Sequence, residues 1–296
     1  MKLNKDTDIL IIGLGVIGGG YAKALTKQGF HIRTITEREE DIEYALKEGM
    51  IEDGRTSVDE EYVRRADLII FALYPHTFVE WLENYQHYFK SGALITDVTG
   101  VKSALVTQVQ EMLRPDVEFI AAHPMAGRER SGVLFSDDGV FRGANYIVTP
   151  TPKNTPEAIG TCRELGWLLG FASVCELTPE EHDRMIAFLS QLTHCIAVTL
   201  MTCNQSPALE QYTGDSFRDL TRIAKINEVM WSELFLLNRD ALLRQMDAFS
   251  AEFERLRTML SAGDAEGMRE MMRTSTARRS LFDKPVNTPN ETPERK

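Results

Sequence analysis

The stretch Ile9-Leu-Ile-Ile-Gly13-Leu-Gly15-Val-Ile-Gly18 joins a short apolar run to three spaced glycines near the N-terminus. Such a continuous run is typical of a strand buried on both faces, and residues Ile17 to Gln28 have the spacing of an amphipathic helix. Between a strand and a helix, Gly-x-Gly-x-x-Gly forms a tight turn whose backbone a pyrophosphate can approach. This context favours a dinucleotide site over a purely structural turn. We assign it to Gly13, Gly15, Val16, Ile17 and Gly18.

The first half of the chain continues this alternation of apolar runs and helical stretches. The further runs are residues 30–35, 66–73, 93–97, 117–122 and 145–149. The alternation predicts a mostly parallel sheet covered on both faces, which is an α/β Rossmann-type dinucleotide-binding domain. A helix over 156–170 and an edge strand over 171–177 are expected to complete it.

The sequence pattern changes at Thr178-Pro179-Glu180-Glu181, which has the N-cap, first-position proline and early acids of a helix start. From there to about residue 282 the apolar spacing is helical. We expect an NAD(P)-binding domain over 1–178 and an all-helical domain over 179–283. The tail 284–296 is rich in Pro, Asn, Thr and charge, and we expect it to be disordered.

Composition excludes several classes of function. The formal net charge of the 296 residues is -11 and the sequence shows no basic stripe, which argues against nucleic-acid and membrane-surface partners. No apolar run approaches the roughly 20 residues of a membrane span. The four cysteines lack CxxC spacing, and neither they nor the histidines form a metal-binding pattern. We expect a cytoplasmic protein without a metal, whose substrate, if anionic, is held by a few local cations.

The end of the second predicted strand bears on the choice of cofactor. It reads Ile35-Thr36-Glu37-Arg38. An acid on the ribose 2′-hydroxyl selects NAD, whereas a nearby arginine accommodates the 2′-phosphate of NADP. Glu37 at the strand tip favours NAD; Thr36 there, with Arg38, would accept NADP. Both interpretations stay open, and we prefer NAD. A third interpretation is that Glu37 and Arg38 are solvated loop charges.

His123 directly follows the predicted strand 117–122 and begins the loop His123-Pro-Met-Ala-Gly-Arg-Glu-Arg-Ser-Gly132. Reactive groups in doubly wound sheets collect at the carboxyl ends of strands. Histidine accepts protons near neutral pH, so it suits removal of a hydroxyl proton as hydride leaves carbon. A strand-end histidine bonded only to backbone is the alternative.

This loop, after a glycine turn, resembles the prephenate/arogenate dehydrogenase (TyrA) family of tyrosine biosynthesis. The resemblance extends through residues 96–102, 181–183, 190–194 and 217–224. It implies an NAD(P)-dependent oxidoreductase with a helical dimerisation domain, hence a homodimer, and a substrate cleft between the domains. The implied reaction is oxidative decarboxylation of prephenate to 4-hydroxyphenylpyruvate.

The chain departs from the family at Gly100, where the family usually places a serine near the reacting hydroxyl. The adjacent Thr99 could supply a hydroxyl instead, and we include it with His123 as a catalytic candidate.

The helical part carries the candidates for binding a dicarboxylate substrate. Ser190 and His194 are four residues apart and share a helix face, as do Arg218 and Arg222. Guanidinium groups bind carboxylates bidentately, and prephenate has two carboxylates. For Arg218 alone, a solvated charged face is a strong alternative. In the loop after His123, the resemblance implies that Glu129 borders the pocket, although a loop salt bridge between Arg128 and Glu129 is nearly as plausible.

Three rival functions remain at this point. An arogenate dehydrogenase would share the whole scaffold. A β-hydroxyacid dehydrogenase is disfavoured, because residues 178–205 contain none of the lysines that such enzymes use for catalysis. A non-catalytic dinucleotide sensor is disfavoured by the retained His123, His194 and Arg222. We expect His182 and Asp183, at the start of the first helix of the second domain, to be structural.

Overall fold

The computed structural model describes residues 2–127 and 130–283. Arg128, Glu129 and the tail 284–296 lie outside the described residues, so the expectations about them stay predictions. By internal packing the chain divides into two units, Met1–Leu242 and Leu243–Lys296.

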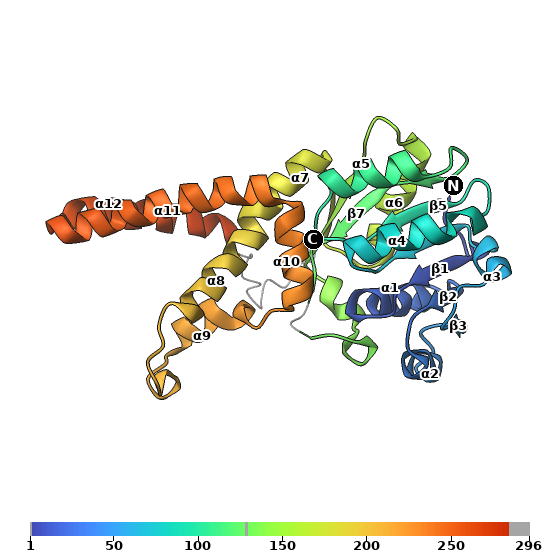
Figure 1. Cartoon of the computed structure of the whole chain (residues 1–296), viewed down its shortest axis with the longest axis horizontal. Coiled ribbons are helices and arrows are strands. Elements are labelled where there is room, and N and C mark those ends of the chain that lie inside the picture. Colours follow the sequence, from blue (N-terminus) through green and yellow to red (C-terminus); the bar gives the residue numbers. More distant parts are fainter. Residues whose placement is uncertain (1, 128–129, 284–296) are drawn as a thin grey trace, which may run out of the picture. The chain divides into compact units, whose positions relative to one another are not determined.

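Unit 1 is built on a six-stranded parallel sheet (Figure 1). Its order is β3-β2-β1-β4-β5-β6. The strands are β1 (Ile9–Ile12), β2 (Ile32–Ile35), β3 (Asp53–Arg55), β4 (Leu68–Phe71), β5 (Leu94–Asp97) and β6 (Glu118–Phe119). The predicted α/β class with a mostly parallel sheet is confirmed.

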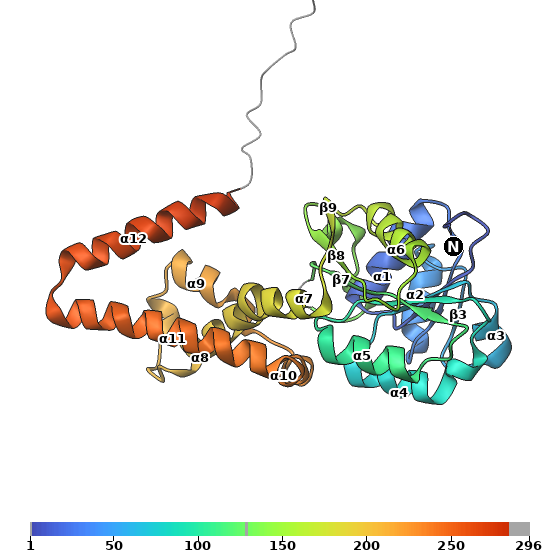
Figure 2. The same ribbon diagram turned by 90° about the horizontal axis from the view of Figure 1, so that it is seen from above.

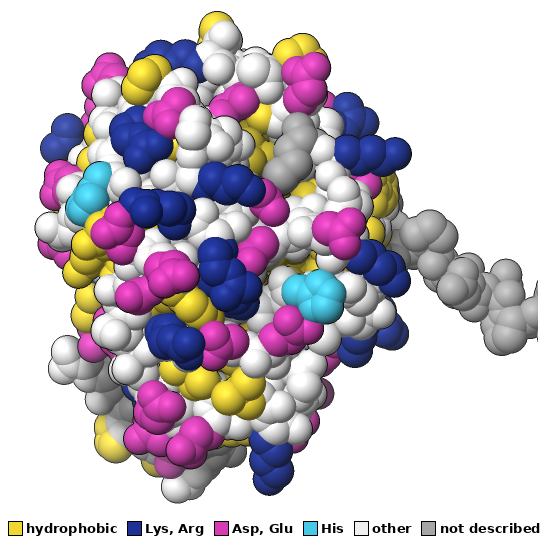
Figure 3. Space-filling view, turned by 90° about the vertical axis from the view of Figure 1, so that its right-hand side faces the viewer, with side chains coloured by type: hydrophobic (Ala, Val, Ile, Leu, Met, Phe, Trp, Pro, Cys, Tyr) yellow, Lys and Arg dark blue, Asp and Glu magenta, His cyan; other side chains and the backbone are white. Residues whose placement is uncertain are grey.

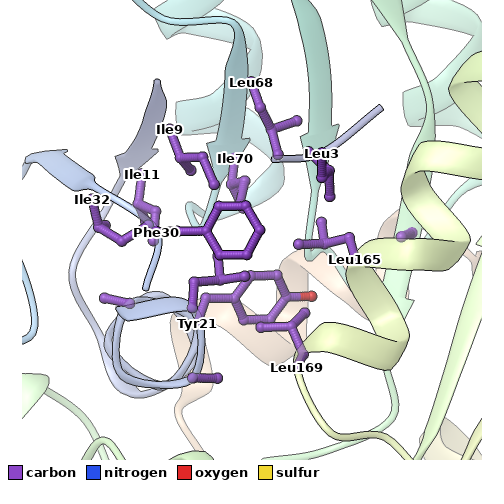
Figure 4. Packing of buried hydrophobic residues seen from close by; sticks show 14 of the residues in the cluster. Leu3, Ile9, Ile11, Tyr21, Phe30, Ile32, Leu68, Ile70, Leu165 and Leu169 are labelled. Carbon is purple, nitrogen blue, oxygen red and sulfur yellow. The ribbon is translucent and has the colours of Figure 1, made fainter. Parts of the chain in front are cut away.

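Helices cover both faces of this sheet (Figure 2). One face packs against α1 (Val16–Lys27), α2 (Glu39–Lys47) and α6 (Pro156–Leu168); the other packs against α3 (Glu60–Arg64), α4 (Pro75–Tyr85) and α5 (Ser103–Met112). Ile9 and Ile11 of β1 point into the first layer, where Tyr21 of α1 lies beside Leu165 of α6 (Figure 4). The intervening Leu10 and Ile12 point into the second layer. Because both faces are buried, the strand is apolar throughout.

A second sheet of three strands carries His123. It comprises β7 (Ala121–Pro124), β8 (Asn145–Thr149) and β9 (Ser173–Glu176), with β8 between its neighbours, antiparallel to β7 and parallel to β9. The one strand predicted over 117–122 is therefore two, β6 and β7, because the chain changes sheets at Ile120. Sequence reasoning also missed β3, whose residues Asp-Gly-Arg form no apolar run.

The helical part begins where the sequence predicts. Thr178 caps α7 (Pro179–Ile186) in a capping box with Glu181. A π-helical turn, η4 (Ala187–Leu192), joins α7 to α8 (Thr193–Thr202), and α9 (Asp215–Thr221), η6 (Arg222–Ala224) and α10 (Glu228–Leu237) follow. All of these belong to the same packed unit as the sheets. The domain boundary at 178 thus stays a prediction.

Unit 2 comprises most of α11 (Arg239–Ala262) together with α12 (Ala265–Arg279). Several of its large apolar side chains are exposed, among them Phe253, Leu260 and Met272 at 62%, 67% and 59%. All regular elements over the described residues 179–283 are helical, as expected.

One segment corrects the expectation about membrane spans. The continuous helical stretch Pro179–Thr202 has 24 residues, and its most apolar window reaches a mean hydropathy of 1.5, so by length and composition alone it could cross a bilayer. The expectation considered only uninterrupted apolar runs, and Gln191 and His194 interrupt this one. Both His182 at its start and Gln191 are buried within unit 1.

Candidate active site

The glycine turn between β1 and α1 has the shape of a pyrophosphate cradle. Gly13 has a φ of +94°, and a Cβ there would lie 2.5 Å from the carbonyl oxygen of Ala72. A Cβ at Gly18 would lie 2.1 Å from the carbonyl oxygen of Gly13. At Gly15, by contrast, a Cβ would meet no atom of the described residues within 4 Å. The turn is closed on the protein side and open at Gly15, the N-cap of α1, where a helix N-terminus attracts phosphate.

Thr36 occupies the position directly after β2, beside the glycine turn. Its hydroxyl accepts a hydrogen bond from the backbone N–H of Leu14 (3.3 Å), while Gly13 N–H donates to the carbonyl of Ile35 (2.8 Å). Glu37 is exposed, and the exposed Arg38 pairs with Glu40 and Asp41. Thr36 therefore stands at the strand end, but Arg38, which the NADP arrangement also requires, is paired with Glu40 and Asp41, so neither arrangement that the sequence left open is complete.

His123 lies near the end of β7 and heads a chain of three titratable side chains. Its Nδ1 is 2.8 Å from Nε2 of His182, and Nδ1 of His182 is 2.8 Å from Oδ1 of Asp183. His182 and Asp183 are buried, with 0% and 4% of their surface exposed, whereas His123 is partly exposed. The expectation of a purely structural His182–Asp183 pair missed this contact, which joins residues 59 positions apart.

Burial and neighbouring charges favour the neutral form of both imidazoles. The pKa of His123 is well below the ordinary 6.5 because of burial, with His182 and Lys102 adding to the shift. Burial also lowers the pKa of His182, although the hydrogen bond to Asp183 opposes this. Burial raises the pKa of Asp183, but hydrogen bonds from His182 and Ser103 outweigh burial and hold it below the ordinary value. His123 is therefore unprotonated near neutral pH, the form that can accept a proton.

The hydroxyl of Thr99 makes its contacts inside the protein. Its hydroxyl donates to Asp97 Oδ2, has the carbonyl oxygen of Val101 at 3.1 Å, and accepts from Nζ of Lys102 (3.1 Å). With 5% of its surface exposed, Thr99 is part of the buried cluster around the Lys102–Asp97 ion pair. Its assignment as a catalytic residue is therefore corrected, because the hydroxyl is already used inside the protein.

Gly100 leaves space beside His123. A Cβ at this position would lie 3.9 Å from Cε1 of His123 and 3.5 Å from Cδ1 of Leu234 on α10. These are ordinary contact distances. The place where the family usually carries a serine is therefore next to the imidazole of His123.

Ser190 and His194 are in contact, and on the Ser190 side the contact is made by the backbone carbonyl. Nδ1 of His194 donates to the carbonyl oxygen of Ser190 (2.9 Å), and the imidazole stacks on Trp231 of α10 with ring centroids 3.7 Å apart. This contact fixes the ring of His194 with Nε2 on the side away from Ser190.

The two arginines of the predicted substrate site lie in different surroundings. Arg218 donates to the carbonyl of Thr213 (2.9 Å), two residues before its own helix, and lies 3.9 Å from Asp215, the first residue of that helix. Arg222 begins η6, which packs against α8, the helix that carries His194.

Helix α10 was not singled out from the sequence, yet it connects these parts. Trp231 contacts His194, and Leu234, one turn later, lies beside Gly100. Asn238, its C-cap, donates to the Gln191 side chain (2.7 Å) and to the carbonyl of Asp183 (2.9 Å). The three-residue spacing of Trp231 and Leu234 was the available sequence signal.

A pyrophosphate cradle on a parallel sheet, together with a neutral histidine at a strand end, defines a nicotinamide-dependent dehydrogenase with an added helical part. Among the described residues, no group of three His, Cys, Asp or Glu side chains is placed to hold a metal.

Comparison with known proteins narrows this class. The chain matches the family models for the nucleotide-binding domain of prephenate dehydrogenase over residues 21–171 and for its dimerization domain over 178–274. It is 33% identical to a prephenate dehydrogenase of Bacillus subtilis, over 93% of this chain and 76% of that protein. The chain belongs to the prephenate dehydrogenase family, as the sequence motifs predicted.

Other relatives agree with this assignment. A cyclohexadienyl dehydrogenase of Zymomonas mobilis is 28% identical over 90% of this chain and 93% of that protein. The crystal structure of prephenate dehydrogenase from Aquifex aeolicus with hydroxyphenyl propionate and NAD+ superposes with a TM-score of 0.87 at 28% identity, covering 96% of this chain and 100% of that one.

Proposed function

We propose that this protein is a prephenate dehydrogenase that oxidises and decarboxylates prephenate to 4-hydroxyphenylpyruvate with NAD. The observation that carries the proposal is His123, a neutral imidazole at a strand end whose Nδ1 is occupied by His182. The direct test is NADH formation, followed by absorbance, when prephenate is added to the purified protein. Failure of the folded protein to reduce either NAD or NADP would overturn the assignment, and arogenate in parallel tests the sister activity.

His123 accepts and returns one proton in this reaction. As hydride leaves the hydroxyl-bearing ring carbon, the hydroxyl proton passes to Nε2 of His123 and a ketone forms. The ring carboxylate then leaves as CO2. The electron pair of the broken carbon–carbon bond completes the aromatic ring, and the former ketone oxygen becomes a phenolate oxygen. That oxygen recovers the proton from His123, so the base is regenerated.

The glycine turn fits the cofactor. NAD, when bound, supplies the hydride acceptor. The open side of Gly15 and the N-terminus of α1 would receive its pyrophosphate, with Val16 and Ile17 contributing backbone N–H groups. Thr36 would face the adenosine ribose.

Cofactor preference provides a prediction at Thr36. Thr36→Asp places a carboxylate where it can bind the ribose 2′-hydroxyl and repel a 2′-phosphate, so we expect the kcat/KM ratio of NAD over NADP to rise about tenfold. Steady-state kinetics with both cofactors measure the ratio. Glu37→Gln, at the exposed neighbouring position, is the matched control and should leave it unchanged. A ratio that responds to Glu37 and not to Thr36 would assign the ribose contact to Glu37.

The substrate carboxylates are assigned to the helical part. In this proposal Arg222 binds one of them bidentately, with Arg218, His194, Ser190 and Glu129 around the same pocket. The proximity of η6 to the helix of His194 supports this assignment.

The two arginines are distinguished by substitution. We expect Arg222→Gln to raise the KM for prephenate by about 10- to 100-fold, because a charge-assisted bidentate contact is lost. Arg218→Gln should have a much smaller effect, because the Arg218 side chain is 56% exposed and pairs with the exposed Asp215 of its own helix, which is typical of a solvated surface charge. Initial rates at varied prephenate compare the two. An unchanged KM in the Arg222 variant would contradict the assignment.

We further infer a cytoplasmic homodimer. The match to a family dimerization domain and the exposed apolar side chains of α11 and α12 support the homodimer. Lys and Arg side chains are interspersed with Asp and Glu on the face shown in Figure 3, which supports a small-molecule substrate over a nucleic-acid partner.

A further inference from the structure

The protons in the chain His123–His182–Asp183 can be placed from its chemistry. A carboxylate only accepts hydrogen bonds, so Nδ1 of His182 must carry the proton that is donated to Asp183 (2.8 Å). His182 is neutral, since burial lowers its pKa. Its Nε2 is then a bare acceptor, and the 2.8 Å contact requires Nδ1 of His123 to donate. The free nitrogen of His123 is consequently Nε2.

Asp183 is itself held rigidly at the end of this chain. Its two carboxylate oxygens accept from the backbone N–H groups of Lys102 and Ser103, both at 2.8 Å, at the start of α5. Its backbone carbonyl accepts from Asn238 of α10 (2.9 Å). The carboxylate therefore cannot turn away from His182 without breaking the cap of α5.

Among the described residues, the titratable groups that act on His123 come from two segments. The start of α7 supplies His182 and Asp183, and the segment from β5 to α5 supplies Lys102 with its ion-pair partner Asp97. The side chain of α10 nearest to Gly100 is the apolar Leu234.

We propose that His182 and Asp183 are positioning residues that keep the proton of His123 on Nδ1 and so present Nε2 as the acceptor for the substrate hydroxyl. The inference rests on the proposed function for the identity of that hydroxyl. The assignment of the tautomer rests on the hydrogen-bond chain together with the neutral form of His182, and not on the identity of the substrate. Without this chain the His123 ring could flip or carry its proton on Nε2, and either state removes the base.

Two substitutions at His182 distinguish its two hydrogen bonds, the one with His123 and the one with Asp183. In His182→Gln the side-chain amide reaches the position of Nε2, so it can still accept from His123. In His182→Asn the amide reaches only the position of Nδ1, so it can still donate to Asp183 but loses His123. The Asn variant thus keeps the contact with Asp183 and the cap of α5. It therefore removes the contact with His123 without disturbing the fold around Asp183.

We expect the Asn variant to lose about 10²-fold in kcat with little change in the KM for prephenate or in NAD affinity. The Gln variant should stay within about fivefold of wild type. As the pH is lowered, kcat/KM of both variants should begin to fall at a higher pH than kcat/KM of the wild type. On acidification a protonated His182 lowers the pKa of His123, and an amide, which cannot take up a proton, removes that contribution. This shift follows from the contact between the two imidazoles, whereas a purely structural role of His182 would leave the tautomer of His123 unchanged in the Asn variant.

The tautomer is measured independently of activity. Two-bond ¹⁵N–¹H correlation spectra of the six histidines, with His123 assigned by its absence in His123→Asn, report which nitrogen is protonated. We expect the Nδ1–H form in wild type and the Gln variant, and loss of that form in the Asn variant. An Nε2–H form in wild type, or an unchanged kcat in the Asn variant of an active enzyme, would overturn the proposal. Failure of wild type to oxidise prephenate, with the tautomer as expected, would overturn only the proposed function.

Discussion

His123→Asn is expected to lower kcat by about 10³-fold while leaving NAD affinity and the thermal unfolding midpoint close to wild type. The amide nitrogen of Asn takes the place of Nδ1 and can keep the hydrogen bond to His182, so the surroundings are preserved. Nothing in the variant replaces Nε2, and the hydroxyl proton then has no acceptor as hydride leaves.

Single-turnover and steady-state rates with prephenate measure this effect, and fluorescence titration with NAD provides the control. A kcat within tenfold of wild type would mean that another group or water accepts the proton. An equal loss of NAD affinity would instead indicate a disturbed fold around β7.

Lys102→Met should lower the free energy of unfolding by about 3–5 kcal/mol. Both Lys102 and Asp97 are fully buried, and Nζ lies 2.7 Å from Oδ2 of the carboxylate. Methionine keeps the length and most of the volume of the side chain but removes its charge. The carboxylate of Asp97 then stays buried with hydrogen bonds from Thr99 and the backbone N–H of Ala122 and without a counter-charge.

Urea unfolding at neutral pH tests this prediction, with Lys90→Met as the matched control. Lys90 also pairs with an aspartate, Asp67, but its side chain is 49% exposed, so its loss should cost about 1 kcal/mol or less. Equal effects of the two substitutions would contradict the special role of the buried pair.

Local sequence patterns were sufficient for the parts of the fold that depend on neighbours along the chain. The apolar run and glycines at 9–18 predict a strand, a turn and a helix, and Thr178-Pro179-Glu180-Glu181 predicts the helix that begins at Pro179. Both depend on backbone geometry and capping within a few residues. His123 was placed at a strand end for the same reason, and the β7 strand carries it there.

Patterns of this kind failed where partners are distant in sequence. Thr99 was assigned a catalytic role because it adjoins Gly100, but the direction of its hydroxyl is set by Asp97 and Lys102 in the folded protein. The division of one predicted strand into β6 and β7 likewise depends on which sheet each half joins.

The sequence by itself therefore determined the class of fold, the glycine turn between β1 and α1, the family and the histidine that the proposal makes the base. Only the tertiary structure decided what holds that histidine. The contact from His123 to His182 spans 59 residues, and the contact from Asp183 to the backbone of Lys102 spans 81. Hydrogen bonds of this kind depend on the packing of α5, α7 and β7 against one another, and no periodicity or spacing along the chain encodes the direction of a buried side chain.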